Sequence, residues 1–197
     1  MADDRTGHIL DSALTVFSQY GYAKTTMQDI ARAAGMSRAA LYLHFASKED
    51  LFRAGSRRAH TRALEHVDAA LAEQGDVLSR VDAAMAAYFG EVTAQISSSA
   101  HGREIFDAGL TLTGDIVSET KAALTARLAC ALQTAAAAGE ARFSHLDTTA
   151  EDIALLLLAA ADGLQKTSTD SAVQHRQRLL FLRLVREAIT PPDDTDS

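Results

Sequence analysis

The chain has 197 residues and a globular composition, in which 47% of the residues are apolar, 23% are charged and 6% are aromatic. This length allows one or two domains with a substantial core. A single cysteine, Cys130, excludes an internal disulfide and fits a reducing cytoplasm. The longest apolar run, Ile153–Ala161, is far shorter than the roughly 20 residues of a membrane span, and the amino terminus has no signal-peptide pattern. We therefore expect a cytoplasmic protein.

Charge is distributed unevenly along the chain. The net charge of −7 argues by itself against a nucleic-acid binder. Residues 1–60, however, hold eight Lys or Arg and six Asp or Glu, a net charge of +2, whereas residues 61–197 hold eleven and twenty, a net charge of −9. The first third is therefore the part of the chain that can approach a phosphate backbone.

The apolar pattern predicts an all-α fold of about nine helices. Both prolines stand at positions 191 and 192, so the preceding chain can form long helices. Apolar side chains recur at three- and four-residue spacing, with glycines and capping residues as stops, and Thr148 with Glu151 is expected to cap the eighth helix. The expected helices cover about 6–20, 26–34, 38–45, 48–74, 76–97, 103–108, 115–138, 149–165 and 172–189, followed by a disordered acidic tail at 191–197.

Residues 25–52 predict two short helices joined by a tight turn and followed at once by a third helix. Thr26 and Asp29 have the spacing of a capping box. Gly35 fits the left-handed position after a helix, and Ser37 is a natural N-cap for the next one. The apolar side chains expected to lock these helices together are Ile30, Ala31, Ala34, Met36, Leu41 and Phe45. This arrangement is a helix-turn-helix, the second helix of which enters the major groove of DNA.

The exposed residues of this segment suit contact with duplex DNA. A guanidinium at the start of the second helix can bind guanine or phosphate, and small alanines beside it allow close approach and can touch a thymine methyl. Hydroxyl, imidazole and ammonium donors around them suit phosphates. Each residue alone fits an ordinary solvent-facing position, so the ordered set carries the hypothesis. The candidates are Thr25, Thr26, Arg38, Ala39, Ala40, Tyr42, His44 and Lys48.

This stretch resembles the DNA-binding domain of the TetR family of transcriptional regulators. The resemblance covers about residues 6–55 and rests on many fixed spacings. The matching segments are Phe17, Gly21-Tyr22, Thr25-Thr26, Asp29-Ile30-Ala31, Ala34-Gly35-Met36-Ser37, Leu41-Tyr42-Leu43-His44-Phe45 and Ser47-Lys48-Glu49-Asp50-Leu51. Met36 replaces the usual valine. Leu43 replaces a commoner polar or aromatic residue, which puts any DNA contact at Leu43 in doubt.

The resemblance implies a DNA-binding regulator, not an enzyme, with no cofactor and no metal. Residues 1–48 are expected to form the DNA-binding domain and residues 49–190 a helical effector-binding and dimerisation domain. Most relatives are repressors that bind a palindromic operator as homodimers and are released by a small effector. The last two helices, about 149–165 and 172–189, are expected to pair with those of a second copy. The apolar run within the first of them independently calls for cover on all sides, which burial within one chain can also supply.

The middle helices carry the candidates for an effector site, which would be mostly apolar. These candidates are Met85, Tyr88, Phe89, Phe106, Leu110 and Leu124. A set of this kind is more often core than pocket, so both interpretations stay open. The long helix after the helix-turn-helix is expected to transmit an effector-driven tilt to the DNA-binding domain.

Other chemistry finds less support in the sequence. His101 and Glu104 lie one helical turn apart, without a recognised metal signature, and Cys130 is expected to pack inertly. Four arginines can extend the basic surface, but a solvated face or interdomain pairs is the favoured interpretation: Arg53, Arg57, Arg58 and Arg62. Two alternatives to a regulator stay open, namely an all-helical enzyme that keeps the fold and a protein-binding module that uses the helix-turn-helix without DNA.

Overall fold

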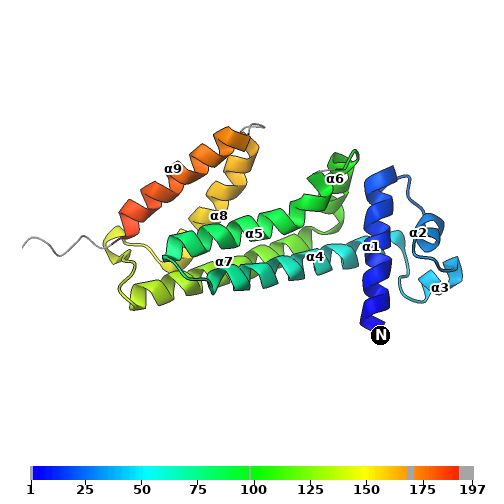
Figure 1. The fold of residues 1–197 in the computed structure, drawn as a ribbon, viewed down its shortest axis with the longest axis horizontal. Helices are drawn as coiled ribbons and strands as arrows, with labels where there is room; N and C mark the ends of the chain where they lie inside the picture. The colour runs from blue at the N-terminus through cyan, green and yellow to red at the C-terminus, as the bar shows by residue number, and fades with distance from the viewer. Residues whose placement is uncertain (1, 98, 168–170, 191–197) are drawn as a thin grey trace, which may run out of the picture. The chain divides into compact units, whose positions relative to one another are not determined.

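The computed structural model describes residues 2–97, 99–167 and 171–190, and Figure 1 shows the course of the chain. Within these ranges the fold is all-α, as predicted. The helices are α1 (Ala2–Tyr20), α2 (Met27–Ala33), α3 (Arg38–Tyr42), α4 (Lys48–Leu71), α5 (Val77–Ser97), α6 (Gly102–Leu112), α7 (Gly114–Ala137), α8 (Ala150–Thr167) and α9 (Ser171–Ile189), with one 3-10 turn, η1 (Ser144–Leu146), before α8. The tail predicted at 191–197 lies outside the described residues.

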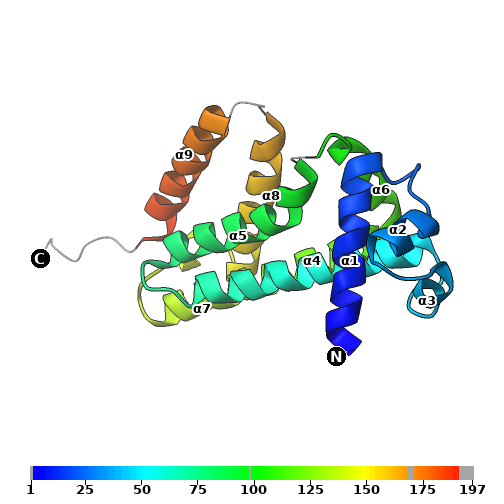
Figure 2. The same cartoon turned by 45° about the vertical axis from the view of Figure 1, so that its right-hand side comes forward.

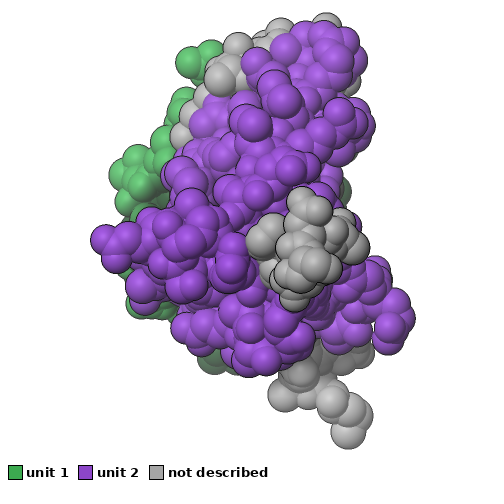
Figure 3. All heavy atoms as spheres, turned by 90° about the vertical axis from the view of Figure 1, so that its left-hand side faces the viewer, with its two compact units in different colours: residues 1–64, 88–120 green, residues 65–87, 121–197 purple. Residues whose placement is uncertain are grey.

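The chain divides into two compact units, which Figure 3 colours green and purple. Unit 1 comprises residues 1–64 and 88–120, and unit 2 comprises residues 65–87 and 121–197. Helices α4, α5 and α7 each supply residues to both units. The boundary expected between residues 48 and 49 would separate a DNA-binding domain from an effector-binding and dimerisation domain. It does not coincide with the division into these two packing units, and it stays a prediction.

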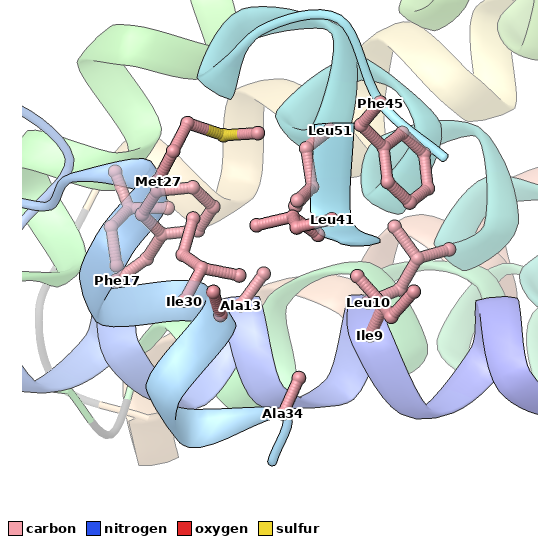
Figure 4. Packing of buried hydrophobic residues seen from close by; sticks show 12 residues of the cluster. Ile9, Leu10, Ala13, Phe17, Met27, Ile30, Ala34, Leu41, Phe45 and Leu51 are labelled. Atoms are coloured by element: carbon pink, nitrogen blue, oxygen red, sulfur yellow. The ribbon is translucent and has the colours of Figure 1, made fainter. Parts of the chain in front are cut away.

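An apolar cluster in unit 1 holds the first three helices together. Its side chains come from α1, α2, α3 and the start of α4, and they point into one shared space between these helices (Figure 4). Ile105 of α6 belongs to the same cluster. The buried members are Ile9, Leu10, Ala13, Phe17, Met27, Ile30, Ala31, Ala34, Leu41, Phe45, Leu51 and Ile105. Burial of these apolar surfaces is the main free-energy term that fixes the positions of α2 and α3.

The predicted capping signals around α2 and α3 are confirmed. The Thr26 hydroxyl accepts a hydrogen bond from the Asp29 amide at 3.2 Å, and the Asp29 carboxylate accepts one from the Thr26 amide at 3.1 Å. The hydrogen bonds that the Thr26 hydroxyl and the Thr26 amide donate to the Asp29 carboxylate lower the pKa of Asp29. Gly35 has a φ of +64°, which is the left-handed conformation that ends α2. The Ser37 hydroxyl accepts a hydrogen bond from the Ala40 amide at 3.1 Å and starts α3.

Helix α3 is shorter than the predicted helix over 38–45. The amides of His44 and Phe45 both donate to the carbonyl of Leu41, at 2.9 and 3.0 Å. The chain therefore leaves the helix after Tyr42 and still returns the Phe45 side chain to the core. Tertiary burial of Phe45, and not local helix propensity, sets this end of α3.

Two other predicted boundaries were wrong. Helix α6 extends to Leu112 instead of ending near Ala108, and at its end the amide and the hydroxyl of Thr113 both donate to the Gly109 carbonyl, at 2.9 and 2.8 Å. Helix α8 is capped one residue later than expected. The Thr149 hydroxyl accepts from the Asp152 amide at 3.1 Å, and the Asp152 carboxylate accepts from the Thr149 amide at 3.0 Å.

Helices α8 and α9 lie side by side and run in opposite directions (Figures 1 and 2). Within unit 2, Arg178 pairs with Asp82 at 2.7 Å and fixes α9 to α5. Large leucine side chains on both helices nevertheless remain exposed: Leu155 (51%), Leu156 (57%), Leu179 (38%), Leu180 (59%) and Leu184 (62%). The part of the chain that the structure describes contains no helix long and apolar enough to cross a bilayer. Cys130 is exposed, so its expected inert packing was wrong.

Candidate nucleic-acid interface

Helix α3 presents a face that the core of unit 1 holds outward. Leu41 is fully buried and Phe45, four residues later, is 7% exposed. These two anchors leave the three residues between them on the outside, and Tyr42, Leu43 and His44 are all exposed. The register of α3 is therefore fixed from below, while its outer face is free of the core.

Arg38 and Tyr42 form an ordered polar pair on this face. The Arg38 guanidinium donates to the Tyr42 hydroxyl at 3.3 Å and lies 5.4 Å from the centre of its ring. Both side chains are exposed. A guanidinium has five N–H donors, so this contact leaves most of them available to a guanine edge or a phosphate. Of the other candidates, Ala39 and His44 are exposed and Ala40 is half-buried.

Of the two predicted threonines, Thr25 lies in the turn before α2 and Thr26 is the N-cap residue of α2. The Thr26 hydroxyl is exposed but donates to the Asp29 carboxylate at 2.6 Å as part of the capping box. Thr25 is only 2% exposed, and its hydroxyl donates to the Gly21 carbonyl at 2.6 Å. The structure thus corrects the expected role of the Thr25 hydroxyl, since burial removes it from the reach of a phosphate and uses it to close the turn.

Lys48 is directed at the same turn. Its ammonium donates to the carbonyls of Tyr22 at 2.7 Å and Thr25 at 3.0 Å, and it lies 4.3 Å from the centre of the Tyr22 ring. Burial lowers the pKa of Lys48, and the nearby Glu104 carboxylate opposes that shift. The charge predicted at the start of α4 is present, but its hydrogen bonds hold the turn between α1 and α2. Phosphate contact by Lys48 stays a prediction.

Glu104 of α6 holds this turn through one of the turn's backbone amides. One carboxylate oxygen accepts a hydrogen bond from the Ala23 amide at 2.7 Å. Gly21 has a φ of +81°, and a Cβ atom there would lie 2.1 Å from the other carboxylate oxygen. Lys48 thus donates hydrogen bonds to carbonyls of the turn, and Glu104 accepts one from an amide of the turn. Ile105, the next residue after Glu104, is buried in the apolar cluster. Gly21 serves both the backbone conformation and the close approach of the carboxylate.

Sequence reasoning missed this role of Glu104 and considered only its spacing from His101. The two side chains do meet, with 3.5 Å between the imidazole Nδ1 and a carboxylate oxygen. Among the described residues, however, no group of three or more His, Cys, Asp or Glu side chains could hold a metal ion. No local signal predicts the contact with Ala23, because 81 positions separate the two residues.

The four arginines of α4 form ion pairs within unit 1, and of these only the pair of Arg58 joins the expected domains 1–48 and 49–190. Arg53 binds Asp115 through two hydrogen bonds of 2.6 and 2.9 Å, which hold the pKa of Asp115 at about 2. Arg58 pairs with Asp11 of α1. The other two pairs are longer, Arg62 with Glu91 at 3.4 Å and Arg57 with Glu119 at 3.8 Å. These arginines are therefore engaged in ion pairs beside α4.

The effector candidates are distributed over both units. Met85 and Leu124 are buried in unit 2, whereas the other four candidates belong to unit 1. There Tyr88 is 2% exposed and its hydroxyl lies 3.3 Å from Nδ1 of the buried His60. Phe89 is half-buried, but Phe106 and Leu110 are 55% and 63% exposed, so unit 1 does not enclose these two side chains. The effector site stays a prediction.

Comparison with known proteins gives the family of this arrangement. Residues 9–54 match the family described as bacterial regulatory proteins, tetR family. The chain is 51% identical over 51 residues to the HTH-type transcriptional regulator AcrR of Shigella flexneri, covering 26% of this chain and 24% of AcrR. It is 38% identical over 87 residues to the HTH-type transcriptional activator FasR of Mycolicibacterium smegmatis, covering 44% of this chain and 40% of FasR. The matches thus span about a quarter to two-fifths of these relatives.

Solved structures extend the similarity in fold to almost the whole chain. SmeT, the repressor of the Stenotrophomonas maltophilia multidrug efflux pump SmeDEF, superposes with a TM-score of 0.66 at 22% identity, over 98% of this chain and 93% of SmeT. A SmeT–triclosan complex gives the same TM-score at 21% identity, over 98% and 95% of the two chains. Residues 9–54, from α1 to the start of α4, therefore match the tetR family of bacterial regulatory proteins, and these solved structures share the fold of almost the whole chain.

Proposed function

We propose that this protein is a DNA-binding transcriptional regulator whose α3 enters the major groove. The outward face of α3 carries the proposal: Leu41 and Phe45 hold the helix from the core side, and the ordered Arg38–Tyr42 pair lies on the outer side. Arg38, Ala39 and Ala40 form the first turn of α3, which is the part of a recognition helix that contacts base edges. Thr26, His44 and Lys48 are proposed to act on phosphates around that face.

We further propose that α8 and α9 pair with the same helices of a second copy. Four leucines of these helices are more than half exposed in the single chain: Leu155, Leu156, Leu180 and Leu184. A twofold interface can cover the same patch on both copies. Such pairing also matches the need of a helix-turn-helix protein for two recognition helices about 34–36 Å apart, in successive major grooves of a palindromic site.

The regulatory mode is proposed to be repression that a small, mostly apolar effector relieves. SmeT supports this mode, since SmeT is the repressor of a multidrug efflux pump and one of its structures is a complex with triclosan. FasR is named an activator, so the sign of regulation is the part of the proposal that relatives support least. An effector acts only by favouring the conformation with the wrong spacing of the two α3 helices, and its differential affinity for the two conformations limits its effect.

The test is a salt titration of binding to duplexes selected from a random library. We expect the logarithm of the affinity to fall linearly with the logarithm of salt concentration. Arg38→Ala is expected to weaken binding and, where Arg38 meets a phosphate, to reduce the slope by about 1. The matched control is Arg142→Ala, which removes an exposed arginine of unit 2 and is expected to change neither quantity.

The titration also separates the two alternatives. A protein-binding module or an enzyme that keeps this fold yields no enriched duplex and no salt-dependent affinity. Recovery of a palindrome with a two-to-one ratio of chains to duplex supports the dimeric regulator. Enrichment of a single half-site bound by one chain contradicts the proposed pairing through α8 and α9 while leaving DNA binding in place.

A further inference from the structure

The exposed face of α3 has a second, apolar row beside the Arg38–Tyr42 pair. Ala39 and Leu43 are four residues apart and therefore lie on the same side of the helix. Leu43 keeps right-handed helical geometry, with φ −74° and ψ −20°, so it continues the row although it caps the helix. Both residues are exposed, and the Leu43 side chain is 87% exposed, the largest value among the exposed large hydrophobic residues.

The local hydrogen bonds hold Leu43 in this position. Its amide donates to the Ala40 carbonyl at 3.2 Å, and the next two amides both donate to the Leu41 carbonyl. Because Leu41 and Phe45 are buried on either side, the backbone cannot turn Leu43 inward without withdrawing an anchor from the core. The apolar cluster of unit 1 thus sets the outward direction of Leu43 through the backbone, whichever rotamer the side chain adopts.

We propose that the row of Ala39 and Leu43 reads the 5-methyl groups of thymines in the major groove, and that Leu43 is a specificity-determining residue. The proposal rests on the proposed DNA-binding function. An apolar side chain on a groove-facing helix has one complementary group among the base edges of the major groove, which is the thymine methyl. The adjacent row of Arg38 and Tyr42 supplies the polar contacts that place the helix.

This chemistry predicts a definite operator property. Each half-site should contain at least one thymine whose methyl group meets Leu43, next to a position contacted by Arg38. Exchange of that thymine for deoxyuridine removes the methyl group and leaves base pairing and the O4 acceptor unchanged. We expect a threefold to fivefold loss of affinity for each such thymine, which is about the effect of losing the burial of one methyl group.

The experiment measures the binding of wild-type and variant full-length chains to the selected duplex and to duplexes with single thymine-to-deoxyuridine exchanges. Leu43→Asn keeps a similar size but is polar, so it should bind the thymine and uracil duplexes equally at the thymine that meets Leu43, whereas a thymine that meets Ala39 should keep its preference. Leu43→Met keeps an apolar side chain and should retain the preference for thymine. Unfolding in urea controls for stability, which neither substitution should change, because Leu43 is exposed.

Three results would overturn the proposal. They are selected half-sites without thymine, equal affinity of the wild type for all exchanged duplexes, and a thymine preference that persists unchanged at every exchanged position in Leu43→Asn. None of these affects DNA binding itself. Complete absence of an enriched duplex, by contrast, removes the proposed function and this inference with it.

Discussion

The head of unit 1, which is the segment from α1 to the start of α4, buries its apolar side chains within one chain. The α8–α9 pair of unit 2 leaves many of its apolar side chains exposed. In the head, eleven buried residues between α1 and the start of α4, together with Ile105 of α6, close one cluster within a single chain. On α8 and α9, leucines such as Leu156 and Leu184 remain more than half exposed although the two helices pack on each other. The head is therefore complete as a packing unit, while the helix pair leaves apolar surface that the described residues of the chain do not cover.

This difference separates stability from assembly. Removal of an apolar group from a closed cluster leaves a cavity and lowers the free energy of unfolding. Removal of one from an uncovered face changes what the face can bind and has little effect on the isolated chain. The two kinds of leucine can be compared directly, because buried and exposed examples occur within a few residues of each other in both regions.

The largest expected effect comes from charging the uncovered face. The double substitution Leu180→Glu and Leu184→Glu places two carboxylates where a second copy is proposed to pack, and burial of unpaired charges is costly. We expect monomers in sedimentation velocity and a loss of operator affinity of at least 100-fold. Leu146→Glu is the control, since Leu146 is 43% exposed on η1, outside the helix pair. A double variant that remains dimeric would contradict the proposed interface.

The next effect contrasts two leucines of the same recognition segment. Leu41→Ala empties a fully buried position of the head cluster and should lower the free energy of unfolding by about 2–5 kcal/mol. Leu43→Ala truncates a residue that is 87% exposed and should change the free energy of unfolding by less than about 0.5 kcal/mol. Urea titrations followed by circular dichroism measure both. Similar losses for the two variants would show that Leu43 packs against the protein.

A smaller effect compares two glycines of the head with left-handed conformations. Gly21 and Gly35 have φ values of +81° and +64°, so alanine at either position should cost about 1–2 kcal/mol of stability. Only at Gly21 would the added Cβ also collide with the Glu104 carboxylate, whereas no atom lies within 4 Å of a Cβ at Gly35. We therefore expect Gly21→Ala to be the more destabilising of the two substitutions in urea unfolding.

Glu104→Ala provides the matching background for that comparison. It removes one hydrogen bond to the Ala23 amide, which should cost about 1 kcal/mol. In this background the additional cost of Gly21→Ala should fall to that of Gly35→Ala, because only the backbone term remains. An unchanged extra cost at Gly21 would mean that the carboxylate does not hold the turn.

How much the sequence predicts depends on how far apart the interacting residues lie. The Thr26–Asp29 capping box, the Gly35 turn and the Ser37 cap involve residues within a few positions of each other, and local patterns predicted all three correctly. The same local patterns placed the cap of α8 one residue early, because Thr148 and Thr149 offer equivalent signals.

Contacts between distant segments escaped prediction for a physical reason. The burial of Thr25, the hydrogen bonds from Lys48 to the α1–α2 turn and the approach of Glu104 all depend on tertiary packing. Sequence patterns alone gave no sign that the Thr25 hydroxyl bonds to the Gly21 carbonyl or that the Lys48 ammonium bonds to carbonyls of the turn. Leu43 was doubted because it departs from the family pattern, yet its exposure follows directly from the buried neighbours Leu41 and Phe45.

The smallest expected effect is a pH dependence that originates at His60 in unit 1. Burial lowers the pKa of His60, and its Nδ1 lies 3.3 Å from the Tyr88 hydroxyl. Near and below the unfolded pKa of about 6.5, the unfolded chain binds a proton that folded His60 does not, so stability falls as the pH decreases through this range. His60→Gln keeps a hydrogen-bonding side chain that does not titrate. The stability of the wild type relative to this variant, measured as the difference in urea unfolding free energy, should therefore be lowest at pH 5, rise with pH and become constant above pH 7. A difference that is constant between pH 5 and pH 8 would mean that the imidazole accepts a proton as readily in the folded chain as in the unfolded one, which its burial beside Tyr88 opposes.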